Sequence, residues 1–248
     1  ILSVSAIVSL PGLAISPMLD DVSRIFPHSR KLDVSMLESL PSLMIIPFML
    51  LSGRWSIAGN KIRILFIGTL LFLLSGIWSL LSSSLTQLIV AGAVMGVGAG
   101  MIIPLSTGLI VEYFTGDRRV RQLGVSSAVN NLTLVVATSV VGYLADVSWH
   151  LAFAVYLLPL ITLILLPAIR RTTPEPEPSG GAQNRQSTLN RGIIARLMLF
   201  YFVITYLSLI VTYNTSYLVS ERGMGDDRSG VIISLFFLAI MAPGFILD

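Results

Sequence analysis

The sequence predicts an all-α polytopic membrane protein, and three observations support this prediction. Of its 248 residues, 54% are hydrophobic and only 12% are charged, and the mean hydropathy is +0.84. Ordinary soluble domains carry about 25% charged residues, so this composition does not fit a water-exposed surface. Long stretches lack Asp, Glu, Lys and Arg altogether, and a spanning helix needs about 20 mainly apolar residues. Disorder is excluded as well, because disordered chains are poor in apolar residues.

Eight helices are predicted from the uncharged stretches, taken in chain order. The stretches are residues 1–19, 39–53, 64–111, 122–145, 151–169, 197–220 and 229–247. The second is short, and residues 34–36 extend it. The third is long enough for two spans, and the polar run 82–87 divides it with a tight turn. Apolar runs such as 160–166 do not alternate with period two, which excludes barrel strands and leaves helices as the spanning structure.

Basic residues are distributed unequally between the two sides of the predicted helices. Eleven Lys and Arg residues fall in the second–third, fourth–fifth and sixth–seventh connections, against five on the opposite side. Cytoplasmic segments carry the excess of Lys and Arg, so we expect a multi-pass protein of the cytoplasmic membrane with a cytoplasmic N-terminus. The pI near 9.4 then reflects the excess of Lys and Arg in the cytoplasmic connections. The lipid bilayer is the expected surrounding, and no nucleic-acid partner is expected.

A linker is predicted between the sixth and seventh helices. Residues 174–178 alternate Pro and Glu and are soon followed by Gly-Gly, a composition that cannot form a packed core. We therefore expect a six-helix bundle over residues 1–169, a cytoplasmic linker over 170–192, and two helices of a second bundle over 193–248. Transporters built from two six-helix halves have this organisation. Because the sequence starts without Met and stops near its eighth helix, we expect it to be part of a longer chain.

Gly92, Gly96 and Gly100 recur every four residues in the fourth predicted helix and so share one face. Small residues on one face let another helix backbone approach closely. Two interpretations stay open, namely a tight static contact and a smooth surface for sliding or rocking. Prolines inside the predicted helices leave a similar choice, between ordinary curvature and bending around a cavity that opens and closes.

Several local patterns resemble the major facilitator superfamily. Residues 111–124 read as an acidic-aromatic helix end, a basic loop and a small residue that opens the next helix, and residues 144–153 resemble the family's junction of helices five and six. Residues 40–48, with Pro41 and Pro47, are similar to helix two of bacterial drug and metabolite exporters. The resemblance implies an N-terminal six-helix bundle followed by the start of a C-terminal bundle, in a carrier of small molecules.

The superfamily's loop signature, G-x-x-x-D-(R/K)-x-G-x-(R/K), is matched only in part between the second and third helices. Its positions fall on Ser52, Ser56, Gly59 and Lys61. Ser56 replaces the acid that helps to latch the two halves in the family, so the resemblance does not carry the latch over to this chain. Gly244 and Asp248 fit the start of a second copy at the expected spacing. Gly92 stands where proton-coupled exporters often carry an Arg.

Acids near the helix boundaries are the candidates for energy coupling, namely Asp20, Asp21 and Glu38. No charged residue lies in a predicted helix interior, where ionisable groups usually mark proton or ion pathways. Solvated helix ends would have the same composition, so both interpretations stay open. Protons are one candidate coupling ion.

An aromatic stripe in the seventh predicted helix is a candidate for substrate binding. Tyr206, Tyr213, Asn214 and Tyr217 follow one another at i, i+7, i+8 and i+11, which is one helical face. Tyr217 has a second interpretation as an interfacial belt residue. Aromatic faces with hydroxyl groups suit amphipathic or sugar-like solutes.

Smaller polar residues supply the remaining candidates for substrate binding. Asn130 and Asn131 lie early in the fifth predicted helix, near its cytoplasmic end. An amide in hydrocarbon needs a hydrogen-bond partner, which another helix or a substrate can supply. Ser5 and Ser9 share a face of the first predicted helix by their i, i+4 spacing.

Together these features predict a secondary active transporter that moves a small organic solute by alternating access. Efflux of drug-like or amphipathic compounds is the first expectation, because the candidate residues are neutral and aromatic and the chain is rich in methionine. A sugar or metabolite carrier of the same superfamily is one alternative, and a non-transporting membrane protein or inactive truncated remnant is another.

The sequence has no cysteine and no hydrolase, zinc or phosphate-loop motif, so no catalytic residue, metal or cofactor is expected. We expect a monomer that binds a small-molecule substrate.

Overall fold

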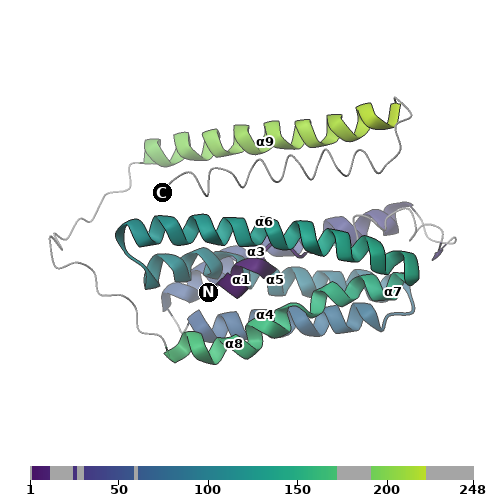
Figure 1. The fold of residues 1–248 in the computed structure, drawn as a ribbon, viewed down its shortest axis with the longest axis horizontal. Helices are drawn as coiled ribbons and strands as arrows, with labels where there is room; N and C mark the ends of the chain where they lie inside the picture. Colours follow the sequence, from purple (N-terminus) through teal and green to yellow (C-terminus); the bar gives the residue numbers. More distant parts are fainter. Residues whose placement is uncertain (1, 12–24, 27–30, 59–60, 172–190, 222–248) are drawn as a thin grey trace. The chain divides into compact units, whose positions relative to one another are not determined.

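Figure 1 shows the computed structural model of the protein, which describes residues 2–11, 25–26, 31–58, 61–171 and 191–221. The chain divides into two compact units. Unit 1 holds the described residues up to 171, and unit 2 holds the described residues 191–221. The boundary between them follows Glu175 and falls inside the predicted linker 170–192.

The described residues are almost entirely helical. The elements are α1 (Leu2–Ile7), α3 (Lys31–Ala58), α4 (Lys61–Leu80), α5 (Leu85–Tyr113), α6 (Gly116–Val147), α7 (Trp149–Ala152), the 3-10 helix η2 (Phe153–Leu157), α8 (Pro159–Arg171) and α9 (Arg191–Glu221). Among the described residues, five segments are long and apolar enough to cross a membrane, namely Leu32–Ser56, Lys61–Leu80, Leu85–Tyr113, Gly116–Ala145 and Trp149–Pro167. These are predicted helices two to six, whereas predicted helix eight lies outside the described residues.

The polar run 82–87 forms the predicted turn between two helices. α4 ends at Leu80 and α5 begins at Leu85. The Ser84 hydroxyl accepts from the backbone N–H of Gln87 at 3.3 Å, and Gln87 Oε1 accepts from the N–H of Ser83 at 2.9 Å. This exchange satisfies backbone donors that a helix start leaves without an intrahelical partner. Two long helices can therefore reverse direction within four residues.

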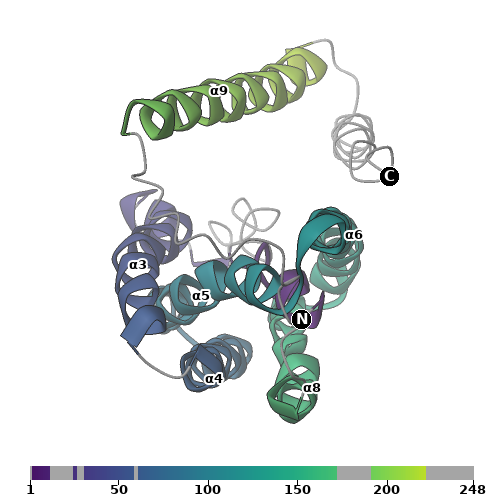
Figure 2. The ribbon, with the colours of Figure 1, turned by 90° about the vertical axis from the view of Figure 1, so that its left-hand side faces the viewer.

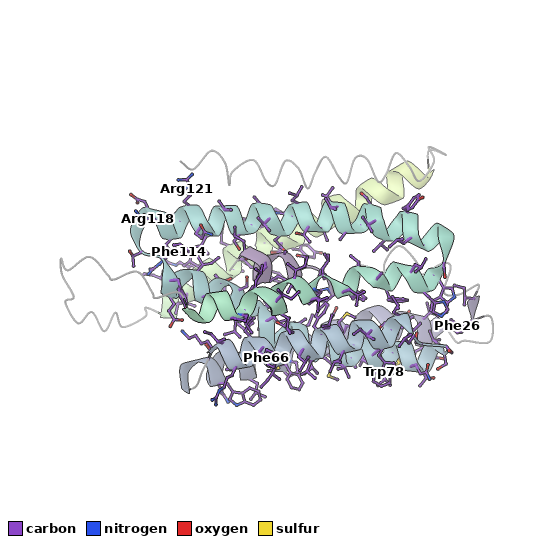
Figure 3. All side chains as sticks on the ribbon, turned by 60° about the horizontal axis from the view of Figure 1, so that its bottom comes forward. Phe26, Phe66, Trp78, Phe114, Arg118 and Arg121 are labelled. Atoms are coloured by element: carbon purple, nitrogen blue, oxygen red, sulfur yellow. The ribbon has the colours of Figure 1, made fainter. Side chains whose placement is uncertain are left out.

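The predicted loops between the second and third helices and between the fourth and fifth helices are shorter than expected, because most of their charged residues lie in helices. α6 begins at Gly116, so Arg118, Arg119 and Arg121 lie in its first turns and not in a loop (Figure 3). Arg119 Nε donates to the carbonyl of Phe114 at 2.8 Å, closing the junction. With 32 residues α6 is about 48 Å long, against roughly 30 Å of hydrocarbon. Charge therefore marks where the apolar span ends, and the helix continues past it.

Unit 1 is organised around α5, against which α3 and α4 both pack (Figure 2). On the other side, α1 packs on α6 and α8, while α8 and η2 also contact α4. α5 packs against the pair α3 and α4, and α1 packs in the same way against the pair α6 and α8. This relation is what an internal repeat of three helices produces, and transporters are often built from such repeats.

The core between α4, α5 and η2 is tightly packed. Phe72 and Tyr156 are fully buried and meet edge to face, with ring centroids 5.9 Å apart. Gly76 lies beneath this pair, where an added Cβ would come within 2.6 Å of the Tyr156 Cβ. Met95 and Ile102 of α5 complete the cluster. Close packing of this kind fixes the helices that surround the candidate site.

Candidate functional site

The three glycines spaced by four form the contact between α5 and α3. An added Cβ at Gly96 would overlap the carbonyl oxygen of Pro41, and one at Gly100 would come within 2.6 Å of the carbonyl oxygen of Ile45. At Gly92 the same atom would lie 3.1 Å from Pro41 Cγ. The two helix backbones therefore approach to a distance that a side chain would prevent. The geometry fits both interpretations of this face, the static and the sliding.

Pro41 takes part in this contact in a second way. Proline has no N–H, so the carbonyl of Leu37 loses the donor that an uninterrupted helix would supply. That carbonyl oxygen faces α5, 3.9 Å from where a Gly92 Cβ would lie. Pro41 and Leu37 are both buried there. The break in the hydrogen-bond ladder of α3 thus lies inside the helix contact and not on the outer surface.

Hydroxyl groups connect α1 to three other helices. Ser5 Oγ lies 3.2 Å from Ser106 Oγ of α5 and accepts from Ser126 Oγ of α6 at 2.5 Å. Thr162 Oγ1 of α8 donates to the carbonyl of Ser3 at 2.9 Å. Ser5 is buried, so its hydroxyl is occupied in packing α1 against α5 and α6. Ser9 is half-buried and lies in a turn after α1, which ends at Ile7, so the predicted helical face shared by Ser5 and Ser9 is not formed.

Asn130 and Asn131 lie deeper than the sequence indicated. They were expected near the cytoplasmic end of their helix, but α6 begins at Gly116 and both lie at its midpoint. Asn131 Nδ2 donates to the carbonyl of Ser127 at 3.0 Å. The Oδ1 atom of Asn130 is buried and has no hydrogen-bond partner. A buried amide oxygen without a donor costs free energy, so this atom is a natural acceptor for a water or a solute group.

A polar stripe runs along α6 on a face that does not border α8. Ser127, Asn131 and Thr138 fall within about 40° of one another around the helix axis, and Ser127 and Thr138 are exposed. Thr138 Oγ1 donates to the carbonyl of Leu134 at 2.7 Å, which leaves its lone pairs pointing away from the backbone. The side of α6 that borders α8 is apolar instead and includes Val136.

A second polar stripe lies on α3. Ser35, Ser39 and Ser42 are exposed and follow one another at i, i+4 and i+7. Ser39 Oγ donates to the carbonyl of Ser35 at 2.8 Å. These serines, Ser127 and Thr138 are not among the predicted binding residues, although their helical spacing is a signal in the sequence that marks them. Figure 2 shows α3 and α6 on the two flanks of α5.

Glu38 lies two turns inside α3, since this helix begins at Lys31. Its backbone is roughly 24 Å along the axis from Arg54 at 1.5 Å per residue, within a hydrocarbon thickness of about 30 Å. Glu38 therefore lies within the span Leu32–Ser56, and its role as a coupling candidate stays a prediction. Asp20 and Asp21 lie outside the described residues, and only the backbone of Glu38 is described.

The signature residues gather where α3, α4 and α5 have neighbouring ends. Ser52 is fully buried and donates to the carbonyl of Met101 at 2.9 Å. Lys61 Nζ and Glu112 Oε2 form an ion pair at 2.7 Å, with both side chains partly exposed. Ser56 is half-buried. Gly59, Gly244 and Asp248 lie outside the described residues.

The opposite end of unit 1 is closed by aromatic residues. Trp149 meets Phe26 edge to face, with centroids 5.8 Å apart, and Figure 3 shows Phe26 at the end away from Arg118. His150 is half-buried, with Nε2 3.1 Å from the carbonyl of Ser82. This contact ties α7 to the turn between α4 and α5.

In unit 2, Tyr206 is 56% exposed on α9. Its ring stacks on that of Phe202 one turn away, with centroids 6.2 Å apart and an interplanar angle of 10°. The pair forms a flat aromatic surface on one face of the helix. Tyr213, Asn214 and Tyr217 belong to α9, but their side chains lie outside the described part of the chain.

Comparison with known proteins decides the family. The family model described as Major Facilitator Superfamily matches residues 1–247. The chain belongs to this superfamily. It is therefore a multi-pass membrane protein of a transporter family.

Curated relatives of this superfamily member include two bacterial resistance proteins. Multidrug resistance protein 3 of Bacillus subtilis (strain 168) is 27% identical over 102 residues, which is 41% of this chain and 20% of that protein. Quinolone resistance protein NorA of Staphylococcus aureus is 27% identical over 115 residues, which is 46% of this chain and 29% of NorA. The match thus covers less than a third of each relative.

Among solved structures, the proton:xylose symporter XylE, determined with 6-bromo-6-deoxy-D-glucose, has the same fold. Its TM-score is 0.64 at 16% sequence identity, covering 97% of this chain and 68% of that chain. At this identity the likeness shows the fold alone.

Proposed function

We propose that this chain is part of a secondary active transporter that exports drug-like or amphipathic solutes by alternating access. The observation that supports export of such solutes is the sequence similarity to a multidrug and a quinolone resistance protein. The polar stripes of α3 and α6 agree with a neutral site, because they hold hydroxyls and amides and no charge. Such groups orient a solute without requiring it to be ionised.

In this proposal, the α6 stripe and the α3 stripe of unit 1 bind the solute. The aromatic face of α9 is a separate candidate surface in unit 2. The Asn130 Oδ1 atom accepts from the solute or from a water beside it. The close α3–α5 contact lets the α3 stripe shift along α5 during alternating access, because α5 projects no side chain at Gly92, Gly96 or Gly100. Glu38 is the coupling candidate, because it is an acid within a spanning helix.

A sugar or metabolite carrier is the second candidate. The five hydroxyl groups of the two stripes, on Ser35, Ser39, Ser42, Ser127 and Thr138, favour it, because sugars are recognised through many hydrogen bonds.

A transport assay with the full-length protein separates the two candidates. Cells expressing it would be loaded either with a fluorescent amphipathic dye or with labelled xylose. We expect lower dye accumulation and unchanged xylose uptake. Raised xylose uptake without dye export would favour the sugar carrier, and no transport of either by folded protein would contradict both.

The cytoplasmic N-terminus and linker are part of the same proposal, and cysteine labelling tests them. The chain has no cysteine, so single substitutions are read without background once any cysteines beyond it are replaced by serine. Leu81, in the α4–α5 turn, is 70% exposed. We expect an impermeant maleimide to label Leu81→Cys in whole cells, and Arg118→Cys only after permeabilisation. The reverse pattern would invert the topology.

A further inference from the structure

A groove of about 390 Å³ opens on the lateral surface of unit 1, between the first turns of α4 and the last turns of α8. Its walls are the apolar side chains of Phe66 and Ile67 on α4 and of Leu163 and Leu166 on α8. Phe66 and Ile67 are each more than 40% exposed, and Figure 3 shows Phe66 on α4. In a spanning protein such a surface faces lipid tails.

The groove ends at basic residues. Arg63 is one of its lining residues and lies in the first turn of α4, where the helix dipole also favours negative charge. Arg170 and Arg171 follow Pro167, another lining residue, by three and four positions in α8. Residues three and four apart are neighbours on a helix surface. Arg63 therefore places a positive charge at the end of the groove, and the sequence adds two basic residues at the end of α8.

A second groove on the same unit supplies the contrast. It lies between α6 and the η2–α8 segment, has a volume of about 590 Å³, and is lined by residues such as Leu132, Val136 and Leu160. None of its lining residues is charged. It offers the same apolar surface to a lipid tail and nothing to an anionic head group.

We propose that the α4–α8 groove is a binding site for an anionic phospholipid. One acyl chain lies along Phe66, Ile67 and Leu163, and the phosphodiester group lies at Arg63. Guanidinium groups suit phosphate oxygens because they can donate two parallel hydrogen bonds. Basic pockets between spanning helices select anionic head groups in this way. The site depends on the membrane location of the chain and not on which solute it transports.

Native mass spectrometry of the purified full-length protein tests this proposal. The detergent-solubilised protein would be equilibrated with equal amounts of dioleoylphosphatidylglycerol and dioleoylphosphatidylcholine, which share their acyl chains. We expect the phosphatidylglycerol adduct to exceed the phosphatidylcholine adduct by about fivefold or more, and Arg63→Gln to lower that ratio roughly fivefold. Arg63→Lys keeps the charge and should retain most of the preference.

Matched variants separate the groove from the general charge of the surface. Leu163→Trp fills the groove and should reduce the phosphatidylglycerol adduct even with Arg63 intact. Val136→Trp, in the uncharged groove, and Arg54→Gln, an exposed arginine at the end of α3, should leave the ratio unchanged. Equal ratios in Arg63→Gln and wild type would overturn the proposal. So would an equal loss in Val136→Trp and Leu163→Trp.

Discussion

α5 and α6 are consecutive helices of similar length, with 29 and 32 residues, yet they bury very different shares of their surface. In the most apolar part of each helix, 61% of α5 is buried within the structure but only 17% of α6. α5 achieves this burial with glycines, which let α3 and α4 approach its backbone. α6 instead carries an uncharged polar stripe that no described helix of unit 1 covers.

The difference shows that two helices of this chain can have similar hydropathy and still serve different purposes. Both helices are apolar enough to span a membrane, but α5 is the structural axis of unit 1. α6 keeps a polar face that needs a partner, which a solute, water or the second half of a transporter can supply. Substitutions in α5 should therefore change stability, and substitutions on the α6 stripe should change transport.

The largest effect is expected at Gly96. In Gly96→Ala the new methyl group meets the backbone of Pro41, so we expect the free energy of unfolding to fall by about 1–3 kcal/mol. Gly108→Ala is the control on the same helix, because nothing lies within 4 Å of its Cβ position. There the better helix propensity of alanine should leave stability unchanged or raise it by up to about 1 kcal/mol. Chemical denaturation in detergent measures both, and equal stability of the two variants would remove α5 from its structural role.

The next effect concerns the α6 stripe. In Asn131→Ala and Thr138→Val, one hydrogen bond to the solute is lost, so kcat/KM for transport should fall about tenfold with little change in stability. Ser139→Ala is the matched control, since Ser139 is exposed on the same helix but lies about 100° around the axis from Thr138. Transport by reconstituted protein is the measurement. A loss in Ser139→Ala as large as in Thr138→Val would place the solute elsewhere.

A smaller effect is expected where the two helices share a contact. Ser106→Ala removes the α5 partner of Ser5 and should lower the free energy of unfolding by about 1 kcal/mol, typical of hydrogen bonds between membrane helices. Thr107→Val, at the exposed neighbouring position, serves as control. A double-mutant cycle of Ser106→Ala with Ser126→Ala should show coupling through Ser5. Strict additivity would mean that the three hydroxyls do not act together.

The smallest effect is expected for the Lys61–Glu112 ion pair, which links α4 to the end of α5. Its side chains are 33% and 40% exposed, so their coupling should not exceed about 1 kcal/mol and should weaken as salt is added. A double-mutant cycle of Lys61→Ala and Glu112→Ala at low and high salt measures it. A salt-independent coupling would show that the pair is more deeply desolvated than its exposure indicates.

The sequence by itself determined the class of the protein, five of its spanning helices, the turn at 82–87 and the family. Uncharged stretches of about 20 residues have few alternatives in a bilayer, because every backbone group must be satisfied within the segment. The glycine spacing in α5 likewise predicted one shared face, since helical period alone brings Gly92, Gly96 and Gly100 together.

Only the tertiary structure decided how far inside its helix each polar residue lies and which residues it contacts. The sequence predicts helix ends where the apolar stretches end, but α3 and α6 continue past them, which places Asn130 and Asn131 at the middle of α6. Which polar residue is used for packing and which stays open was equally hidden. Ser5 is covered because α5 and α6 bring hydroxyls to it, whereas Thr138 stays exposed because no described helix packs on its face. Periodicity gives each residue an angle around its own helix, and the neighbouring helices decide which angles are buried.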